Sequence, residues 1–414
     1  MELYRALGRA LGPPPPRGSR GTEGPHTAAG VAAVAAAARA ARGGAAAQPA
    51  RALPLVQTAA ALAAESAAKG ALKATGEGPD LDARIHTLVT SNGSPYLNVQ
   101  TRIMHATYKK VAAGPGGGAM AGFTRILHRS APDELVAEVP THRVAPATPA
   151  CDGWCEFPVA DRPPAVRAFF DAVRAGGARL DGGWVFLAET DYVFIAPLTP
   201  PGPSTTHPGT LFPFGYIDPG HPDAAPHVAR LLPAGVPPSS VPGTGPAPAL
   251  LPVAAWDAVV PHWVAATAAV EADADGRRVL GWVREMYAFS AAVAAATAAG
   301  AMAPPALPAP PLSPLIAQPP ADADAGAAAA LHYTWGANIT DSGGAPVWAF
   351  DKRAWTDAAL VSSPPTLAPV PEWEEGWRLA GGERVSAELA ATLAREAAAI
   401  NAAVASLPKL GERQ

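Results

Sequence analysis

The chain has 414 residues, enough for two or three domains of ordinary size. Its formal net charge of −4 gives no global positive field, so the composition argues against nucleic-acid binding. The 49% hydrophobic content overstates the core, because much of it is alanine in a chain with 48 prolines and 40 glycines.

Residues 1–80 form a low-complexity leader rich in alanine, proline and arginine, and we expect its removal to leave core stability unchanged. Its longest uncharged window, residues 24–38, spans 15 residues. A membrane-spanning helix needs about 20 apolar residues. The pattern is compatible with disorder, a poor signal or weak membrane anchor, a transit-like segment, or an incompletely read gene. A helix at 55–72 also fits.

Strand and helix patterns alternate beyond the leader. Ile85–Thr90 predicts a strand that ends in the turn-rich loop T-S-N-G-S. Residues 98–111 predict a helix with one apolar face, and Gly122–Leu127 predicts a second strand. Asp161 is expected to cap the next helix, whose first turn contains two prolines.

Two carboxylates follow the third predicted strand, Trp184–Ala188. The order of elements predicts a parallel α/β sheet, in which ligands gather at the carboxyl ends of the strands. If extended geometry persists, Glu189 and Asp191 leave on the same face, roughly 6–7 Å apart. Mg²⁺ and similar ions typically take one or two carboxylates and substrate phosphates. The pattern therefore indicates a nucleotide-diphosphate site; two solvated loop acids are the alternative.

The second half of the chain predicts a helix, two short strands and a terminal helix between proline-rich loops, at residues 279–302, 331–335, 348–353 and 386–407. In the first helix, Trp282, Met286 and Phe289 are expected to share an apolar face with Glu285. An acid on such a face is a candidate base or nucleophile, or a structural hydrogen-bond partner.

The two cysteines, Cys151 and Cys155, lie in C-D-G-W-C. They are too few for a Cys₄ zinc site, and no H-x₃-H follows them. They form either a local disulfide, which a secretory compartment would favour, or two free thiols.

Short blocks from 86 to 353 occur in the following order: H-T-L-V-T-S-N (86–92), Q-T-R-I-M (100–104), Y-K-K (108–110), G-F-T-R-I-L-H (122–128), G-W-V-R-E-M-Y-A (281–288), Q-P-P (318–320), H-Y-T-W-G (332–336) and F-D-K-R (350–353). The same blocks occur in this order in plant and algal hydroxyproline O-arabinosyltransferases, which the chain resembles over about residues 85–378. The resemblance implies an α/β, GT-A-like (Rossmann-like) mixed sheet with flanking helices. It also implies a leader (1–80), a glycosyltransferase domain (81–378) and a helical tail (379–414).

The resemblance further implies a retaining, metal-assisted enzyme of the Golgi or secretory lumen. Such an enzyme transfers L-arabinofuranose from UDP-β-L-arabinofuranose to hydroxyproline-rich polypeptides. The cofactor would be Mn²⁺ or Mg²⁺, held by Glu189, Asp191 and His332. Asp191 and Glu285 are the candidate catalytic residues.

Seven further residues are candidates for binding the UDP-sugar. Their side chains offer hydroxyls and an amide for the nucleoside, or charges for the diphosphate and sugar: Thr90, Ser91, Asn92, Arg102, Arg125, Asp351 and Lys352. The alternatives are a plain turn at 90–92, surface ion pairs for the arginines, and an Asp351–Lys352 pair. Asn338-Ile339-Thr340 is a glycosylation sequon that fits a lumenal protein.

The chain departs from the family pattern mainly on the acceptor side. Thr190 replaces the usual proline between the acids, and Asp161-Arg162-Pro163-Pro164 lacks the family's Trp. The loop 241–247 lacks the polar residues expected, and Ala321 replaces another Trp. Two other functions therefore stay open: a related UDP-sugar peptidyl transferase such as a serine O-galactosyltransferase, or a non-catalytic lumenal binder of proline-rich polypeptides.

Overall fold

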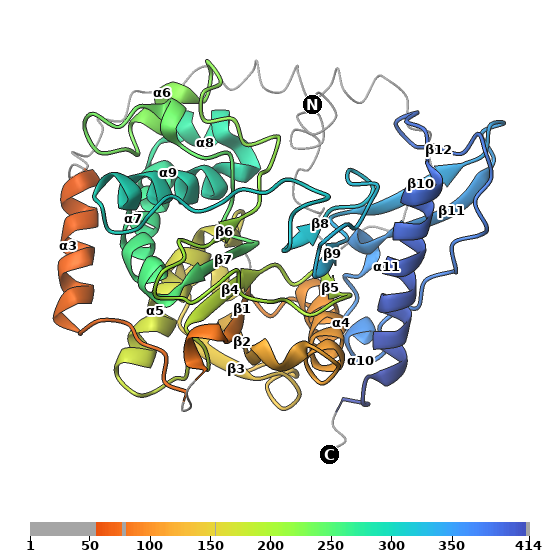
Figure 1. The fold of residues 1–414 in the computed structure, drawn as a ribbon, viewed down its shortest axis with the longest axis horizontal. Helices are drawn as coiled ribbons and strands as arrows, with labels where there is room; N and C mark the ends of the chain where they lie inside the picture. The colour runs from red at the N-terminus through yellow and green to blue at the C-terminus, as the bar shows by residue number, and fades with distance from the viewer. Residues whose placement is uncertain (1–54, 77–79, 154, 411–414) are drawn as a thin grey trace.

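A computed structural model describes residues 55–76, 80–153 and 155–410. Its main feature is a six-stranded sheet in the order β3-β2-β1-β4-β7-β6 (Figure 1). The strands are β1 (Ile85–Ser91), β2 (Met120–His128), β3 (Thr141–Val144), β4 (Trp184–Ala188), β6 (Thr210–Leu211) and β7 (Ala249–Pro252).

The first four strands in that order are parallel, as the strand and helix pattern predicts. Strand β7 runs antiparallel to both β4 and β6, so the complete sheet is mixed. Every residue of β1 and β4 is buried, which explains why β4 reads as a continuous apolar run; β1 also buries His86 and three hydroxyl side chains. The carboxyl ends of β1 and β4 are neighbours, and they bring Thr90 and Glu189 to the same edge.

Helices cover both faces of this sheet (Figure 1). Helix α5 (Arg162–Arg174) packs on β1, β2 and β3, and α7 (Val253–Ala272) packs on β4 and β7. Helix α4 (Pro95–Ala112) lies on the other side with α10 (Ala359–Ser362) and α11 (Ala387–Ser406). Asp161 precedes α5 as predicted but does not cap it, because Asp161 Oδ1 accepts from the backbone N–H of Thr148 instead.

Two small sheets join the main one. The first contains β5 (Tyr192–Phe194), β8 (Ile316–Ala317) and β9 (Ala330–His332), in the order β5-β9-β8. The second contains β10 (Gly336–Thr340), β11 (Pro346–Asp351) and β12 (Arg378–Leu379). Strand β5 pairs antiparallel with β9, and Tyr192 lies opposite His332 in this pairing. The segment that follows β4 is therefore joined to residues 140 positions later in the chain.

The prediction of one continuous helix over residues 279–302 is wrong. The segment contains the end of α8 (Ala274–Leu280), the short 3₁₀ helix η6 (Gly281–Val283) and α9 (Arg284–Ala298). Gly281 has a left-handed φ of 59°, which ends α8 and redirects the chain. Trp282 is consequently 47% exposed, whereas Phe289 is fully buried, so the predicted shared face does not form.

Helix α7 lies in a stretch that the sequence pattern left unassigned. It packs against α9, α3 (Leu55–Ala68) and α5, and it buries Trp256, Val259 and Trp263. Among the described residues, it is the only helix long and apolar enough to cross a membrane. Its burial on several sides identifies it as a core helix.

The structured region begins before the predicted boundary at residue 81. Helix α3 packs on α7, and Lys69 Nζ donates to Asp171 Oδ2 of α5 at 2.8 Å. Leu72 is 5% exposed, and its backbone N–H donates to Asp257 of α7. Residues 55–76 therefore belong to the folded unit. The predicted anchor window at 24–38 lies outside the described residues.

Candidate active site

The triplet Glu189-Thr190-Asp191 links β4 to β5 through a turn rather than an extended segment. The two acids therefore do not share a face as predicted, and each has its own partners. Thr190 is buried, and its hydroxyl donates to Gln100 Oε1 of α4 at 3.2 Å. The turn thus separates two small ionic clusters at the edge of the sheet.

The first cluster surrounds Asp191, which is 6% exposed. His332 Nε2 lies 3.0 Å from Asp191 Oδ2, and Lys352 Nζ forms an ion pair with the same oxygen. Burial opposes ionisation of Asp191, but His332 and Lys352 outweigh it and hold the carboxyl pKa well below its usual range. Asp191 is therefore ionised at any physiological pH.

Aromatic and amide groups fix the other members of this cluster. The Tyr192 ring lies 4.8 Å from the His332 ring, and Gln318 Nε2 lies 2.9 Å from His332 Nδ1. Lys352 Nζ lies 5.6 Å from the centroid of the Tyr333 ring and 5.8 Å from that of Tyr96. These contacts give His332 and Lys352 defined orientations toward Asp191.

The second cluster surrounds Arg162, the first residue of α5. Its Nη2 contacts both carboxylate oxygens of Glu189, at 2.7 and 2.8 Å, and its Nε donates to the Thr90 hydroxyl at 3.2 Å. Its Nη1 lies 3.5 Å from Glu285 Oε2 of α9. A guanidinium with planar donors can bind oxygens on several sides at once. Arg162 thus joins the ends of β1 and β4 to α9.

Glu285 is 1% exposed. Burial raises the pKa of its carboxyl to about 7; Arg162 and Trp263 oppose the shift, and Glu189 reinforces it. A buried carboxyl with a pKa near neutrality can exchange a proton or act as a nucleophile under physiological conditions. Glu285 and Asp191 therefore supply this region with one carboxyl whose pKa is raised and one whose pKa is lowered.

The two arginines predicted to bind the diphosphate have structural partners instead. Arg102 pairs with Glu138 at 2.8 Å, and its other nitrogens donate to the carbonyls of Val361 and Pro408. Arg125 forms a two-nitrogen pair with Asp133, at 2.6 and 2.8 Å. Because both arginines pair with acids that lie outside the two ionic clusters, we leave both residues out of the candidate site.

The turn after β1 and the Asp351 region also differ from expectation. Ser91 Oγ and Asn92 Oδ1 accept backbone N–H groups of the turn, as the alternative of a plain turn predicts. Asp351 pairs with Arg353 rather than with Lys352, so the predicted Asp351–Lys352 pair is absent. Only Thr90 and Lys352 of these candidates contact the two clusters.

The predicted metal ligands fit a divalent cation only in part. Asp191 and His332 face one another and are suitable ligand types, whereas Glu189 is bound to Arg162. In the part of the chain that the structure describes, no three His, Cys, Asp or Glu side chains are grouped to hold a metal ion. Two protein ligands completed by water and phosphate oxygens are nevertheless sufficient for Mg²⁺-type sites.

Arg162 and Gln318 are the site residues that sequence reasoning missed. Arg162 stands in the D-R-P-P block, where an arginine beside a helix start was a usable signal. Gln318 lies in the Q-P-P block, but its contact with His332 depends on the pairing of β8 with β9. Such a contact has no local pattern.

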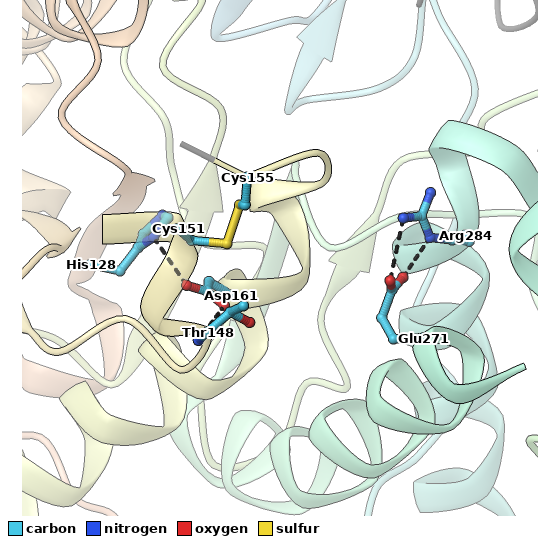
Figure 2. The surroundings of a disulfide bond; sticks show 7 residues. All are labelled: His128, Thr148, Cys151, Cys155, Asp161, Glu271 and Arg284. Carbon is cyan, nitrogen blue, oxygen red and sulfur yellow. Dashed lines mark hydrogen bonds and ion pairs between the residues drawn. A yellow bond between two sulfur atoms is a disulfide. The ribbon is translucent and has the colours of Figure 1, made fainter. Parts of the chain in front are cut away.

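The two cysteines form a disulfide just before α5 (Figure 2). Beneath it, the buried pair His128 and Asp161 have Nδ1 and Oδ2 4.0 Å apart, and burial lowers the pKa of His128 to about 4. His128 is therefore neutral at physiological pH. The disulfide closes the loop that precedes Arg162, so it lies close in sequence to the second cluster.

The fold and site together define an α/β protein whose buried acids and cations gather at the carboxyl end of a mixed sheet. Such an edge is where ligands of α/β proteins bind. The sequence profile of the hydroxyproline O-arabinosyltransferase family N-terminal domain matches residues 85–302. The chain is 30% identical over 294 residues to hydroxyproline O-arabinosyltransferase NOD3 of Pisum sativum, covering 70% of this chain and 80% of that protein. Hydroxyproline O-arabinosyltransferase PLENTY of Lotus japonicus is 30% identical over 296 residues, covering 70% and 75%. The chain belongs to the hydroxyproline O-arabinosyltransferase family and is a glycosyltransferase.

Proposed function

We propose that the chain transfers L-arabinofuranose from UDP-β-L-arabinofuranose to the hydroxyl of hydroxyproline in polypeptides. The observation that carries this proposal is the family match over 85–302, because that range contains both acids of the triplet, Arg162 and Glu285. The strand order 3-2-1-4 with a following antiparallel strand is compatible with a GT-A-like arrangement.

The donor diphosphate is proposed to bind between the two ionic clusters. Arg162 and Lys352 are cations held in place at this edge, and Thr90 offers a hydroxyl beside them. Oriented cations at a developing diphosphate charge stabilise the transition state without reorganising when the reaction occurs. Arg162 would bind and orient the diphosphate while it keeps its contact with Glu189.

Asp191 and His332 are proposed to hold a divalent cation, and when bound that cation would neutralise charge on the departing diphosphate. Gln318 orients His332 through Nδ1, which leaves Nε2 directed at Asp191. Such support from an outer residue fixes the ring of a ligating histidine. Glu189 is proposed to orient Arg162 rather than to bind the metal.

Glu285 is the proposed nucleophile of a retaining reaction. Its carboxylate would form a bond to C1 of the sugar as the C1–O bond to the diphosphate breaks and UDP leaves with the electron pair. The hydroxyproline oxygen would then attack C1, break the bond to Glu285 and give its proton to a UDP phosphate oxygen. Two inversions at C1 keep the configuration of the donor.

The disulfide is consistent with a protein of the secretory pathway, because disulfides persist in oxidising compartments. We propose the Golgi lumen as the site of action. The sequon Asn338-Ile339-Thr340 lies on β10, with Asn338 exposed. Glycosylation there would support this location.

The proposal is tested by incubating the protein with several UDP-sugars and a hydroxyproline peptide, with mass spectrometry as the readout. We expect a pentose addition that requires the hydroxyl, so a matched proline peptide should stay unmodified. Transfer of a hexose, or transfer to serine in a matched peptide, would replace the proposal with a related peptidyl transferase. No transfer in any combination, together with peptide binding, would indicate a non-catalytic binder.

A further inference from the structure

Asp191 lies in a turn between two strands that belong to different sheets. Strand β4 of the main sheet ends at Ala188, and β5 of the second sheet begins one residue after Asp191. The Asp191 carbonyl accepts the backbone N–H of Tyr333 at 3.2 Å. Where the Asp191 carboxylate stands relative to His332 and Lys352 therefore depends on the other contacts that hold this turn.

Helix α4 packs on β5 and contacts this segment with two buried polar side chains (Figure 1). The Thr190 hydroxyl, directly before Asp191, donates to Gln100 Oε1 at 3.2 Å. The Phe194 backbone N–H, three residues after Asp191, donates to the Thr107 hydroxyl oxygen at 3.1 Å. Gln100 and Thr107 are spaced by about two helical turns, so they lie on one face of α4. The helix thus holds the chain on both sides of Asp191.

The chemistry of the two hydrogen bonds makes each of them directional. Strand β5 is at the edge of its sheet, in the order β5-β9-β8, so an N–H that points away from β9 needs a partner elsewhere. The Thr107 hydroxyl donates its proton to the Met104 carbonyl at 2.8 Å, which leaves its oxygen to accept from Phe194. Gln100 is 1% exposed and Thr190 is 2% exposed, so water does not compete for the bond between them.

The same face of α4 also reaches the cation that pairs with Asp191. Tyr96 lies one helical turn before Gln100. The centroid of its ring is 5.8 Å from Lys352 Nζ, and that ammonium forms the ion pair with Asp191 Oδ2. One helix therefore contacts both the turn that contains the acid and the lysine that faces it.

We propose that Gln100 and Thr107, here called the α4 clamp, are positioning residues that hold the Asp191 carboxylate in place against His332 and Lys352. Because Asp191 is the proposed cation ligand, this inference rests on the proposed function. The α4 clamp acts through the backbone of the turn rather than on the substrates. Loss of either bond would let the turn take other positions, and a displacement of about 1 Å at a reacting site can cost about 100-fold in rate.

The first experiment compares Thr107→Val with Thr101→Val, two substitutions on the same helix. Thr101 is also buried, and its hydroxyl donates within α4 to the Leu97 carbonyl at 2.7 Å. Hydrogen exchange is followed by mass spectrometry on peptides that cover residues 189–195. Exchange there should become at least about tenfold faster in Thr107→Val and stay unchanged in Thr101→Val. Thr107→Ser keeps the hydroxyl and should restore the protection.

The second experiment measures UDP affinity by titration calorimetry with Mn²⁺ and with EDTA. Gln100→Met and Thr190→Val should each weaken UDP binding about fivefold with Mn²⁺ and have little effect with EDTA. The double variant should show no further loss, because both substitutions remove the same hydrogen bond. Thr107→Val should behave like Gln100→Met, and Thr101→Val should behave like wild type.

Unchanged exchange in Thr107→Val would overturn the α4 clamp. Faster exchange with unchanged UDP affinity in Mn²⁺ would also overturn it, because the bonds would then hold the segment without positioning Asp191. Equal losses of affinity with Mn²⁺ and with EDTA would show a general structural role and have the same consequence. If wild type binds UDP equally well without Mn²⁺ and transfers no sugar, the proposed function fails, whereas faster exchange in Thr107→Val would still support the α4 clamp.

Discussion

At the scale of single residues, the most informative group is Glu285, whose carboxyl has a pKa of about 7 because it is buried. The proposed role requires the ionised form, which becomes populated as the pH rises through 7. We therefore expect kcat to increase between pH 6 and 8 and to level off above. Glu285→Gln should reduce kcat by at least about 100-fold and abolish this rise.

The control for this pH profile is Glu271→Gln, which removes a partly exposed acid paired with Arg284. It should keep the rise in kcat. A rate in wild type that is constant from pH 6 to 8 would contradict the role of Glu285, as would substantial activity in Glu285→Gln.

Asp191 and Lys352 form a buried ion pair, so their substitutions are expected to be coupled. Asp191→Asn leaves a buried ammonium without its counterion, and breaking such a pair costs about 3–5 kcal/mol. The double variant Asp191→Asn/Lys352→Met should recover most of this loss in denaturant unfolding. Both variants should lack transferase activity, because Asp191 is proposed to hold the cation that neutralises charge on the departing diphosphate.

The double variant separates the two roles of Asp191. If it is as stable as wild type and still inactive, the activity loss is not caused by unfolding. If the single and double variants are equally destabilised, the loss of stability in Asp191→Asn does not come from leaving the Lys352 ammonium without a counterion. Near-normal activity in either variant would remove Asp191 from the proposed site.

At the scale of elements, α3 is the segment whose role differs most from the sequence prediction. It packs on α7, and Glu65 pairs with Arg167 of α5 at 2.5 Å. Ala59 of α3 and Leu72, which follows α3, are both buried. Deleting residues 1–76 should therefore lower Tm by at least about 5 °C relative to deleting residues 1–54.

Thermal unfolding of the two truncated chains, followed by circular dichroism, checks this expectation. Glu65→Gln in the longer chain, which removes only an exposed ion pair between α3 and α5, should shift Tm by less than about 2 °C, since exposed pairs contribute little. Equal Tm values in the two truncations would mean that α3 adds nothing to the core.

The elements that the sequence predicts well are those whose signal is local. Strand β4 is a continuous apolar run, β1 ends in a loop rich in turn residues, and α11 begins after Ser386, whose hydroxyl accepts from Leu389 N. Helix α7 was missed because it is apolar around its whole circumference and contains Pro261, so it has no clear periodicity. The acids at 189 and 191 were found, but not their separate partners.

The partners could not be predicted because they come from distant parts of the chain. Arg162 reaches Glu189 only because α5 packs beneath the sheet and starts beside the ends of β1 and β4. Lys352 reaches Asp191 from the end of β11, in a different sheet. Residue types indicate a charged site, whereas the choice of partner depends on tertiary packing.

At the scale of the whole molecule, the candidate site is a junction of three sheets. Asp191 follows the main sheet, His332 ends β9 of the second sheet, and Lys352 follows β11 of the third. A cation site formed by Asp191 and His332 would therefore require the main sheet and the second sheet to assemble correctly. UDP supplies phosphate oxygens that a divalent cation prefers, so metal and nucleotide should bind cooperatively.

We expect His332→Ala to weaken UDP affinity in the presence of Mn²⁺ about tenfold, which corresponds to about 1.4 kcal/mol. With EDTA, the same substitution should have little effect, because the imidazole is proposed to act through the cation. Titration calorimetry of wild type and variant under both conditions gives the four affinities. Gln318→Leu, which removes only the group that orients His332 Nδ1, should produce a smaller loss that likewise requires Mn²⁺. Equal losses with Mn²⁺ and with EDTA would mean that His332 contacts the nucleotide directly or supports Asp191 structurally, and its assignment as a ligand would then be withdrawn.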